Sequence, residues 1–199
     1  MRFSPTWRKC SQRWLFIFSL LVSAWRVSAQ VAPFGIDSIP VVNGKIVFQA
    51  EFVTDMDQAT VRNRVSLYLN DVLKPHTGTV YVNNDNHIRC RITDYINISA
   101  SLLQSVGMYM TYDLSLQYKN GGWTMLIWDI LYVEKQYYEA QEVSKRKLDI
   151  PQYSAEDIIL GNQYKLILIK NASKRIAESS IERINGIVRD LDVLFSEKG

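Results

Sequence analysis

The stretch Met108–Val133, MYMTYDLSLQYKNGGWTMLIWDILYV, predicts two long strands joined by a tight turn, around which the rest of the sheet can be placed. In its first half the apolar side chains recur at every second position and share one face of a strand: Met108, Met110, Tyr112, Leu114 and Leu116. Asn120-Gly121-Gly122 supplies residues that tolerate the positive φ angles of a hairpin turn. The sequence leaves two loop lengths open, two residues or three, and a shift of one residue turns Asp129 toward the core or away from it.

The same alternation occurs before this hairpin, at His87–Ile98, which follows a shorter strand at Thr79–Asn83 and a turn at residues 84–86. One face of the longer strand is apolar and contains Ile88, Cys90, Ile92, Ile96 and Ile98. The other face is mostly polar and contains His87, Arg89, Arg91, Thr93 and Tyr95. This pattern is typical of an antiparallel sheet that is covered on one side.

A hairpin and a helix are expected before these strands. Val41–Phe48 predicts a hairpin, or a strand entered through an Asn43-Gly44 turn. Gln58–Leu73 predicts an amphipathic helix that Asp55 or Asp57 caps. The apolar residues of this helix are spaced by three and four, which places them on one stripe: Val61, Val65, Tyr68, Leu69 and Val72.

The C-terminal part is expected to be a loop followed by a long helix. Residues 136–160 are charged and poorly patterned, and we expect an exposed loop there. Residues 161–197 are expected to form a helix that packs on the sheet through Ala177, Ile181, Ile184, Val188, Leu191 and Phe195. Tyr164–Ile169 either extends this helix backwards or forms an extra strand. The predicted fold class is α+β: an antiparallel sheet of about five strands, with the N-terminal amphipathic helix and the long C-terminal helix on one face.

Residues 1–29 have the pattern of a signal peptide: basic residues, the apolar run Trp14–Ala24, and Val27-Ser28-Ala29. We expect cleavage near Ala29, a tether at residues 30–39, and a soluble mature protein in the periplasm or outside the cell, with no transmembrane segment. Cleavage removes five of the 23 Lys and Arg residues and none of the 20 Asp and Glu residues, so the formal net charge changes from +3 to −2. The mature protein is therefore not expected to be a general polyanion binder, and Cys90 is left without a disulfide partner.

Three segments of the chain carry a family resemblance. They are the run Ile39–Phe48, IPVVNGKIVF; the amphipathic helix after it; and the hairpin at Lys119–Gly122, which closes on Asp129–Tyr132, DILY. Together they resemble exported bacterial domains of unknown function with a fold like that of the TATA-binding protein (TBP-like). The resemblance covers about Ile39–Val133 and implies a TBP-like α+β domain at residues 40–135 in an exported bacterial protein. It implies no activity and supplies no catalytic residues.

Cysteine and histidine do not predict a catalytic or metal centre, and no cofactor is expected. A nucleophile with its base would need Cys90 or a serine beside His76 or His87, but Cys90 and His87 alternate onto opposite faces of one strand, which argues against a thiol enzyme. His87 with Asp85 and His76 could supply metal ligands, although this spacing is loose and the residues around Asp85 have the composition of a turn.

Two carboxylates offer a further candidate for catalysis. Asp113 and Asp129 would face each other across the hairpin if its loop has three residues. Solvent-facing acids are the simpler interpretation, because charged residues mostly lie outside. A hydrolytic enzyme is therefore the least favoured of the functions considered.

The face of the sheet opposite the helices is the candidate binding surface. Its expected contact residues combine arginine donors with aromatic contact area: Arg89, Arg91, Tyr95, Tyr109 and Trp123. We expect a non-catalytic module that binds a protein, a glycan or a small molecule, with a homodimer also compatible and nucleic acid disfavoured by export and charge. The same residues are equally compatible with a structural role, in which the aromatic rings pack within the fold and the arginines keep the sheet soluble.

The alternative function is a carrier of a small apolar ligand between the sheet and the C-terminal helix. Its expected lining is Met108, Met110, Trp128 and Ile184. Ordinary core packing explains these side chains more simply, and a cavity among them would distinguish the two interpretations.

Overall fold

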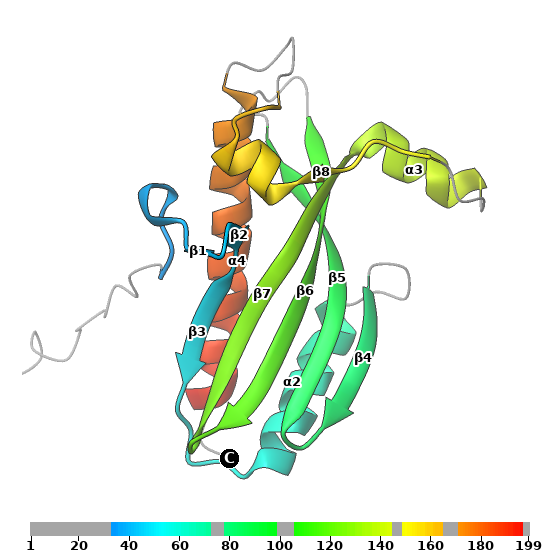
Figure 1. Ribbon diagram of the computed structural model, residues 1–199. Coiled ribbons are helices and arrows are strands. Elements are labelled where there is room, and N and C mark those ends of the chain that lie inside the picture. The colour runs from blue at the N-terminus through cyan, green and yellow to red at the C-terminus, as the bar shows by residue number, and fades with distance from the viewer. Residues whose placement is uncertain (1–32, 73–77, 99–105, 145–148, 165–170, 197–199) are drawn as a thin grey trace, which may run out of the picture. The chain divides into compact units, whose positions relative to one another are not determined.

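An antiparallel sheet forms the centre of the structure and has six strands among the described residues (Figure 1). The structure, a computed structural model, describes residues 33–72, 78–98, 106–144, 149–164 and 171–196. The strand order is β3-β7-β6-β5-β4, and β8 also pairs with β7. The strands are β3 Phe48–Phe52, β4 Gly78–Asn84, β5 His87–Asn97, β6 Gly107–Lys119, β7 Gly122–Glu134 and β8 Tyr153–Ser154.

Two Asn-Gly turns connect neighbouring strands. The short strands β1 (Val41–Val42) and β2 (Lys45–Ile46) are joined by Asn43-Gly44, with φ angles of 51° and 76°. Between β6 and β7 the loop is Asn120-Gly121, with φ angles of 53° and 85°. Asparagine and glycine adopt these positive angles at low cost, as a type I′ turn requires. The loop whose length the sequence left open therefore has two residues.

One residue of β7 is extra relative to β6. The pairing of these strands changes register between Thr111 and Asp113, and Asp129, with a φ of 51°, is the extra residue. In the unbroken register of the two-residue loop, Asp129 would lie opposite Tyr112 and share its direction toward the core. The bulge instead exposes 53% of the Asp129 side chain and gives the core position to Ile130, which is 2% exposed.

Two helices, α2 (Gln58–Val72) and α4 (Ala172–Ser196), cover the same face of the sheet (Figure 1). The helix α2 begins after Asp57, whose carboxylate accepts hydrogen bonds from the Thr60 backbone amide at 2.9 Å and from its hydroxyl at 2.7 Å. Apolar residues of both helices share one core with the strands: Val61, Val65 and Leu69 from α2, and Ile176, Ile181, Ile184, Ile187, Leu191 and Phe195 from α4. The predicted α+β arrangement, with both helices on one face, is confirmed.

A charged network fastens α4 to the sheet. Arg183 donates from Nε to Asp94 Oδ2 at 2.7 Å and from Nη2 to Asp94 Oδ1 at 3.2 Å, and the Tyr112 hydroxyl donates to Asp94 Oδ2 at 2.6 Å. Burial, followed by the charge of Asp94, raises the pKa of Tyr112 well above its ordinary value. This bidentate pair explains why a carboxylate can occupy a helix-facing position of β5.

The described part of residues 136–160 is not the exposed loop that the sequence predicted. It contains most of the helix α3 (Lys135–Ser144), the strand β8 and the π-helix η3 (Glu156–Leu160), while residues 145–148 lie outside the described residues. No residue of α3 is buried, so no apolar stripe marks this helix in the sequence. Ala155 and Ile158, at 0% exposure, anchor the segment around η3 in the core.

The two ends of the described chain also differ from expectation. The segment from Pro33 onward is not a loose tether, because it contains the 3₁₀ turn η2 (Ile36–Ser38). It is also bonded to α4: the Phe34 backbone amide donates to Asn185 Oδ1 at 3.2 Å, and Asn185 Nδ2 donates to the Phe34 carbonyl at 2.9 Å. The long C-terminal helix begins at Ala172 rather than at residue 161.

Some predictions fall partly or wholly on residues that the structure does not describe. The predicted signal peptide lies outside the described residues, and so do residues 165–169 of the Tyr164–Ile169 segment, while Tyr164 itself belongs to no helix or strand. Within the described ranges, no helix is both long enough and apolar enough to cross a membrane.

Candidate functional site

We use the name open face for the side of β5, β6 and β7 that points away from α2 and α4. On β5 and β6 it is built from directly opposed pairs of side chains, one from each strand: His87 and Gln117, Arg89 and Ser115, Arg91 and Asp113, Thr93 and Thr111, and Tyr95 and Tyr109. Strand alternation explains this row, because the intervening residues of both strands face the helices and all of them except Asp94 are buried. The polar face that the sequence predicted for His87–Ile98 is therefore present.

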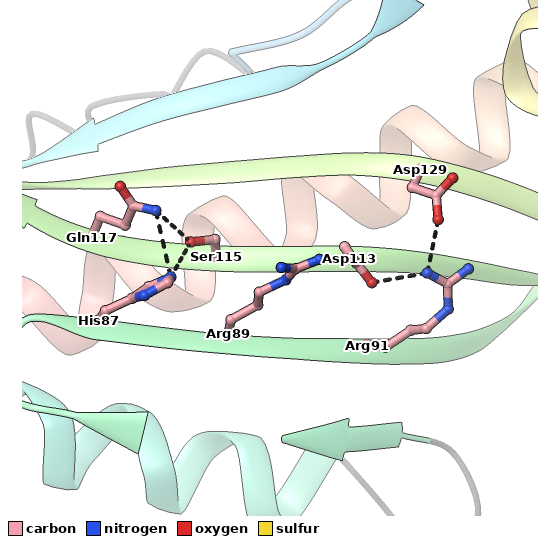
Figure 2. A network of polar contacts seen from close by, with 7 residues as sticks. All are labelled: His87, Arg89, Arg91, Asp113, Ser115, Gln117 and Asp129. Atoms are coloured by element: carbon pink, nitrogen blue, oxygen red, sulfur yellow. Dashed lines mark hydrogen bonds and ion pairs between the residues drawn. The ribbon is translucent and has the colours of Figure 1, made fainter. Parts of the chain in front are cut away.

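Two arginines and two aspartates form the centre of the open face (Figure 2). Arg89 Nη2 donates to Asp113 Oδ2 at 2.6 Å, and Arg91 Nη1 donates to Asp113 Oδ1 at 2.9 Å and to Asp129 Oδ2 at 2.8 Å. The side chain of Asp113 is 6% exposed, whereas those of Arg89 and Asp129 are 41% and 53% exposed. The nearly buried carboxylate of Asp113 thus lies beneath the two guanidinium groups and fixes their positions, while the arginine side chains remain partly exposed on the open face.

The electrostatics of Arg91 follow from this arrangement. Burial by itself would lower the pKa of Arg91, but the hydrogen bond that Arg91 donates to Asp129 and the charges of Asp113 and Asp129 outweigh it, so the pKa is raised. Arg91 therefore remains charged while it joins the two carboxylates.

Asp113 and Asp129, the pair of carboxylates considered in the sequence, do lie on the same face of the sheet, but for a different structural reason than expected. They were expected to face each other if the loop had three residues, whereas the loop has two and the bulge at Asp129 brings this side chain to the open face. Arg91 lies between Asp113 and Asp129 and bonds to both. Their geometry is therefore that of an ion-pair network, and no proton-sharing contact joins the two acids.

A second polar group lies beside this network. His87 Nε2 is 3.0 Å from Ser115 Oγ, and Gln117 Nε2 lies 3.4 Å from both atoms (Figure 2). A serine beside a histidine is the geometry of a nucleophile and its base, and strand alternation alone could not identify Ser115 as the serine beside His87. Ser115 is 1% exposed, so its hydroxyl is closed off from a substrate in this arrangement.

Cys90 lies on the core face, opposite to His87, as the strand alternation predicted. It is 0% exposed, and burial, followed by the nearby charge of Asp113, raises the pKa of its thiol to about 12. A protonated thiol is a poor nucleophile and a poor metal ligand. Among the described residues, His, Cys, Asp and Glu form no group of three or more that could hold a metal ion, and His76 lies outside these residues.

The tryptophan assignment from the sequence was wrong. Trp123 is 1% exposed and packs in the core, with its ring centroid 5.6 Å from that of Tyr118 and 6.0 Å from that of Phe195. The two-residue loop fixes this outcome, because it sets residue 123 on the helix-covered face.

Trp128 lies on the open face instead, although it was assigned to the lining of an apolar pocket. The guanidinium carbon of Arg89 is 5.2 Å from the Trp128 ring centroid and 6.0 Å from that of Tyr81. Tyr81, on the edge strand β4, is 55% exposed. Arg89 is therefore flanked by two rings at distances typical of cation–π contacts.

The predicted residues Tyr95 and Tyr109 do lie together on the open face, where α3 joins them. The ring of Tyr138 from α3 stacks on Tyr109 with a centroid distance of 3.9 Å, and Tyr95 meets Tyr109 edge-on at 5.4 Å. Lys135 Nζ, at the start of α3, is 5.6 Å from the Tyr95 ring centroid. The helix α3 thus bounds one end of the row, and its contribution could not be predicted while this segment was assigned to a loop.

The other side chains assigned to an apolar pocket lie in the core. Met108, Met110 and Ile184 are each at most 1% exposed and belong to the packed cluster between sheet and helices. One cavity of about 330 Å³ lies between the end of β5 and α4 and is lined in part by Asn97 and Gly186. Another, of about 490 Å³, lies at the β6–β7 turn. Neither is lined by the residues expected for a carrier.

Comparisons with known proteins identify the fold. A TBP-like protein from Parabacteroides distasonis is 14% identical, with a TM-score of 0.62, over 81% of this chain and 99% of that one. A DUF4468 family protein from Bacteroides ovatus is 17% identical, with a TM-score of 0.61, over 80% of this chain and 91% of that one. No family model matches the chain, and no curated protein does. The TBP-like fold that the sequence suggested, known from bacterial domains of unknown function, is confirmed.

Proposed function

We propose that this protein is an exported, non-catalytic binding domain that uses the open face to hold a ligand or partner. The observation that carries the proposal is the clamp at Asp113, a nearly buried carboxylate that fixes Arg89 and Arg91 while leaving their outer parts accessible. Groups held in advance lose little conformational freedom on binding, which favours affinity. Export is supported by the pattern of residues 1–29.

The charges of the open face disfavour nucleic acid. Both arginines are already bonded to carboxylates, so a phosphate would have to compete with Asp113 and Asp129 for them. The formal charge of −2 on the chain without residues 1–29 acts in the same direction.

Native mass spectrometry of the mature protein, purified from its own cell envelope, tests the proposal. We expect a retained small molecule, a partner or a second copy of the chain. The double variant Arg89→Ala/Arg91→Ala should lose this species, whereas Arg189→Ala, at an exposed position of α4, should keep it.

The double variant leaves Asp113 without either partner, so its fold must be checked by circular dichroism. Tyr81→Ala, at an exposed position, provides a variant with little effect on folding. A bound species that persists in both folded variants, or a mature protein that carries no bound species at all, would refute the proposal.

A further inference from the structure

We infer that the ligand of the open face is an uncharged carbohydrate chain that lies along β5 and β6. This inference rests on the proposed function and names the class of its ligand. It follows from three properties of the same surface: balanced charge, an excess of hydrogen-bonding capacity, and flat aromatic rings at two separated places.

The charge of the row is balanced within short distances. Arg89 and Arg91 are matched by Asp113 and Asp129, with nitrogen–oxygen distances of 2.6 to 2.9 Å. At the α3 end, the Lys135 ammonium lies 3.8 Å from a carboxylate oxygen of Glu139. A polyanion or a polycation would have to break such pairs, whereas an uncharged ligand leaves them intact.

The same groups can still make further hydrogen bonds. A guanidinium has five N–H donors and a carboxylate has about four acceptor sites, and both bonds from Arg91 to carboxylates come from Nη1. The hydroxyls of Thr93 and Thr111, 3.0 Å apart, continue the row. Sugar hydroxyls both donate and accept hydrogen bonds, so a surface with donors and acceptors side by side and little net charge suits them.

Arg89 also keeps one donor unused. Its Nε atom is buried and makes no hydrogen bond within the described part of the chain, a property that it shares with Nε1 of Trp123 in the core. Buried donors in native proteins nearly always have an acceptor, and an unpaired one calls for an explanation. A ligand oxygen that enters between Tyr81 and Trp128, the two rings that flank this guanidinium, would supply the acceptor.

Aromatic rings occur at two places along the row. Tyr81 and Trp128 flank Arg89, and Tyr95, which is 41% exposed, lies beside Tyr109 near α3. Arg89 and Tyr95 are six residues apart on β5, which corresponds to about 20 Å along a strand. Flat rings offer apolar area to the C–H face of a sugar, and a ligand that reaches both places must be an extended chain.

Titration calorimetry of the mature protein with defined oligosaccharides tests the inference. The neutral probes are hexasaccharides of β-1,4-glucose, α-1,4-glucose and β-1,4-N-acetylglucosamine, and the charged probe is a sulfated heparin hexasaccharide. We expect at least one neutral hexasaccharide to bind with a Kd of about 1 mM or lower, independently of salt. Tyr81→Ala and Trp128→Ala should each weaken binding about tenfold, while Tyr137→Ala, at an exposed position of α3, should not change it.

The inference is overturned if none of the neutral hexasaccharides binds, or if the sulfated one binds more tightly than all of them. It is also overturned if the folded Tyr81→Ala and Trp128→Ala proteins bind as well as the unmodified protein. Native mass spectrometry separates this failure from failure of the proposed function. A retained species that the Arg89→Ala/Arg91→Ala variant loses, without any binding of neutral sugars, would leave the binding face in place and exclude carbohydrate.

Discussion

The clamp at Asp113 makes a quantitative prediction for the substitution Asp113→Asn, which removes the negative charge but keeps the shape of the side chain. Asp113 accepts two charge-assisted hydrogen bonds, from Arg89 at 2.6 Å and from Arg91 at 2.9 Å, and is 6% exposed. Each such bond contributes about 1.5–3 kcal/mol. The arginine side chains are 41% and 27% exposed, so water compensates part of the loss, and we expect a net destabilisation of about 2 kcal/mol.

The matched control is Asp129→Asn, because Asp129 bonds to the same Arg91 but its side chain is 53% exposed. We expect this change to lower the free energy of unfolding by at most about 0.5 kcal/mol. Urea unfolding of the mature protein, followed by far-ultraviolet circular dichroism, measures both losses at an unchanged m-value. Thermal unfolding should show a decrease in Tm of about 4–8 °C for Asp113→Asn. Equal losses for the two variants would refute the assignment of Asp113 as the buried centre of the network.

Three further predictions concern other parts of the fold. Gly186→Ala should raise the free energy of unfolding by about 0.5–1 kcal/mol, because Gly186 lies within α4 and the nearest atom to an added Cβ is 3.8 Å away; Gly107→Ala, where a Cβ would collide with the Tyr95 ring, should lower it in the same urea assay. Tyr138→Ala removes the stacking partner of Tyr109, so hydrogen exchange in α3 should accelerate while exchange in β6 stays unchanged; equal acceleration in both elements would contradict this. The raised pKa of Tyr112 favours its protonated form in the folded state, so its contribution to stability should be constant below about pH 10 and be lost as the pH rises above it, and the alkaline loss of stability should be less steep in Tyr112→Phe; parallel pH profiles of the two proteins above pH 10 would exclude this contribution.

The strands and helices could be predicted because an element that is buried on one side has apolar residues at regular intervals in its sequence. The alternation at His87–Ile98 and the stripe in the C-terminal helix both correspond to residues that the structure places in one core. The Asn-Gly pairs likewise predicted turns, because these residues tolerate positive φ. The open face and its residues Arg89, Arg91, Tyr95 and Tyr109 followed directly from the alternation.

The sequence did not reveal features that depend on a single backbone choice. One bulge residue, Asp129, reverses the direction of a side chain, and no periodicity marks it. Trp128 lies on the open face in place of the predicted Trp123, because the loop between β6 and β7 has two residues rather than three. The helix α3 buries none of its residues, so its sequence resembles a solvent-exposed loop. Long-range contacts such as Asn185 with Phe34 also leave no local pattern.

The proposed binding face exists only if the helices cover the face of the sheet that contains Trp123 and leave open the face that contains Trp128. Of the five tryptophans in the sequence, these two follow residues 1–29, so the variants Trp123→Phe and Trp128→Phe of the mature protein each retain one. Acrylamide quenching of the single remaining tryptophan measures its accessibility directly. We expect Trp128 to be readily quenched and Trp123, at 1% exposure, to be shielded. Equal quenching of the two, or stronger quenching of Trp123, would contradict the claim.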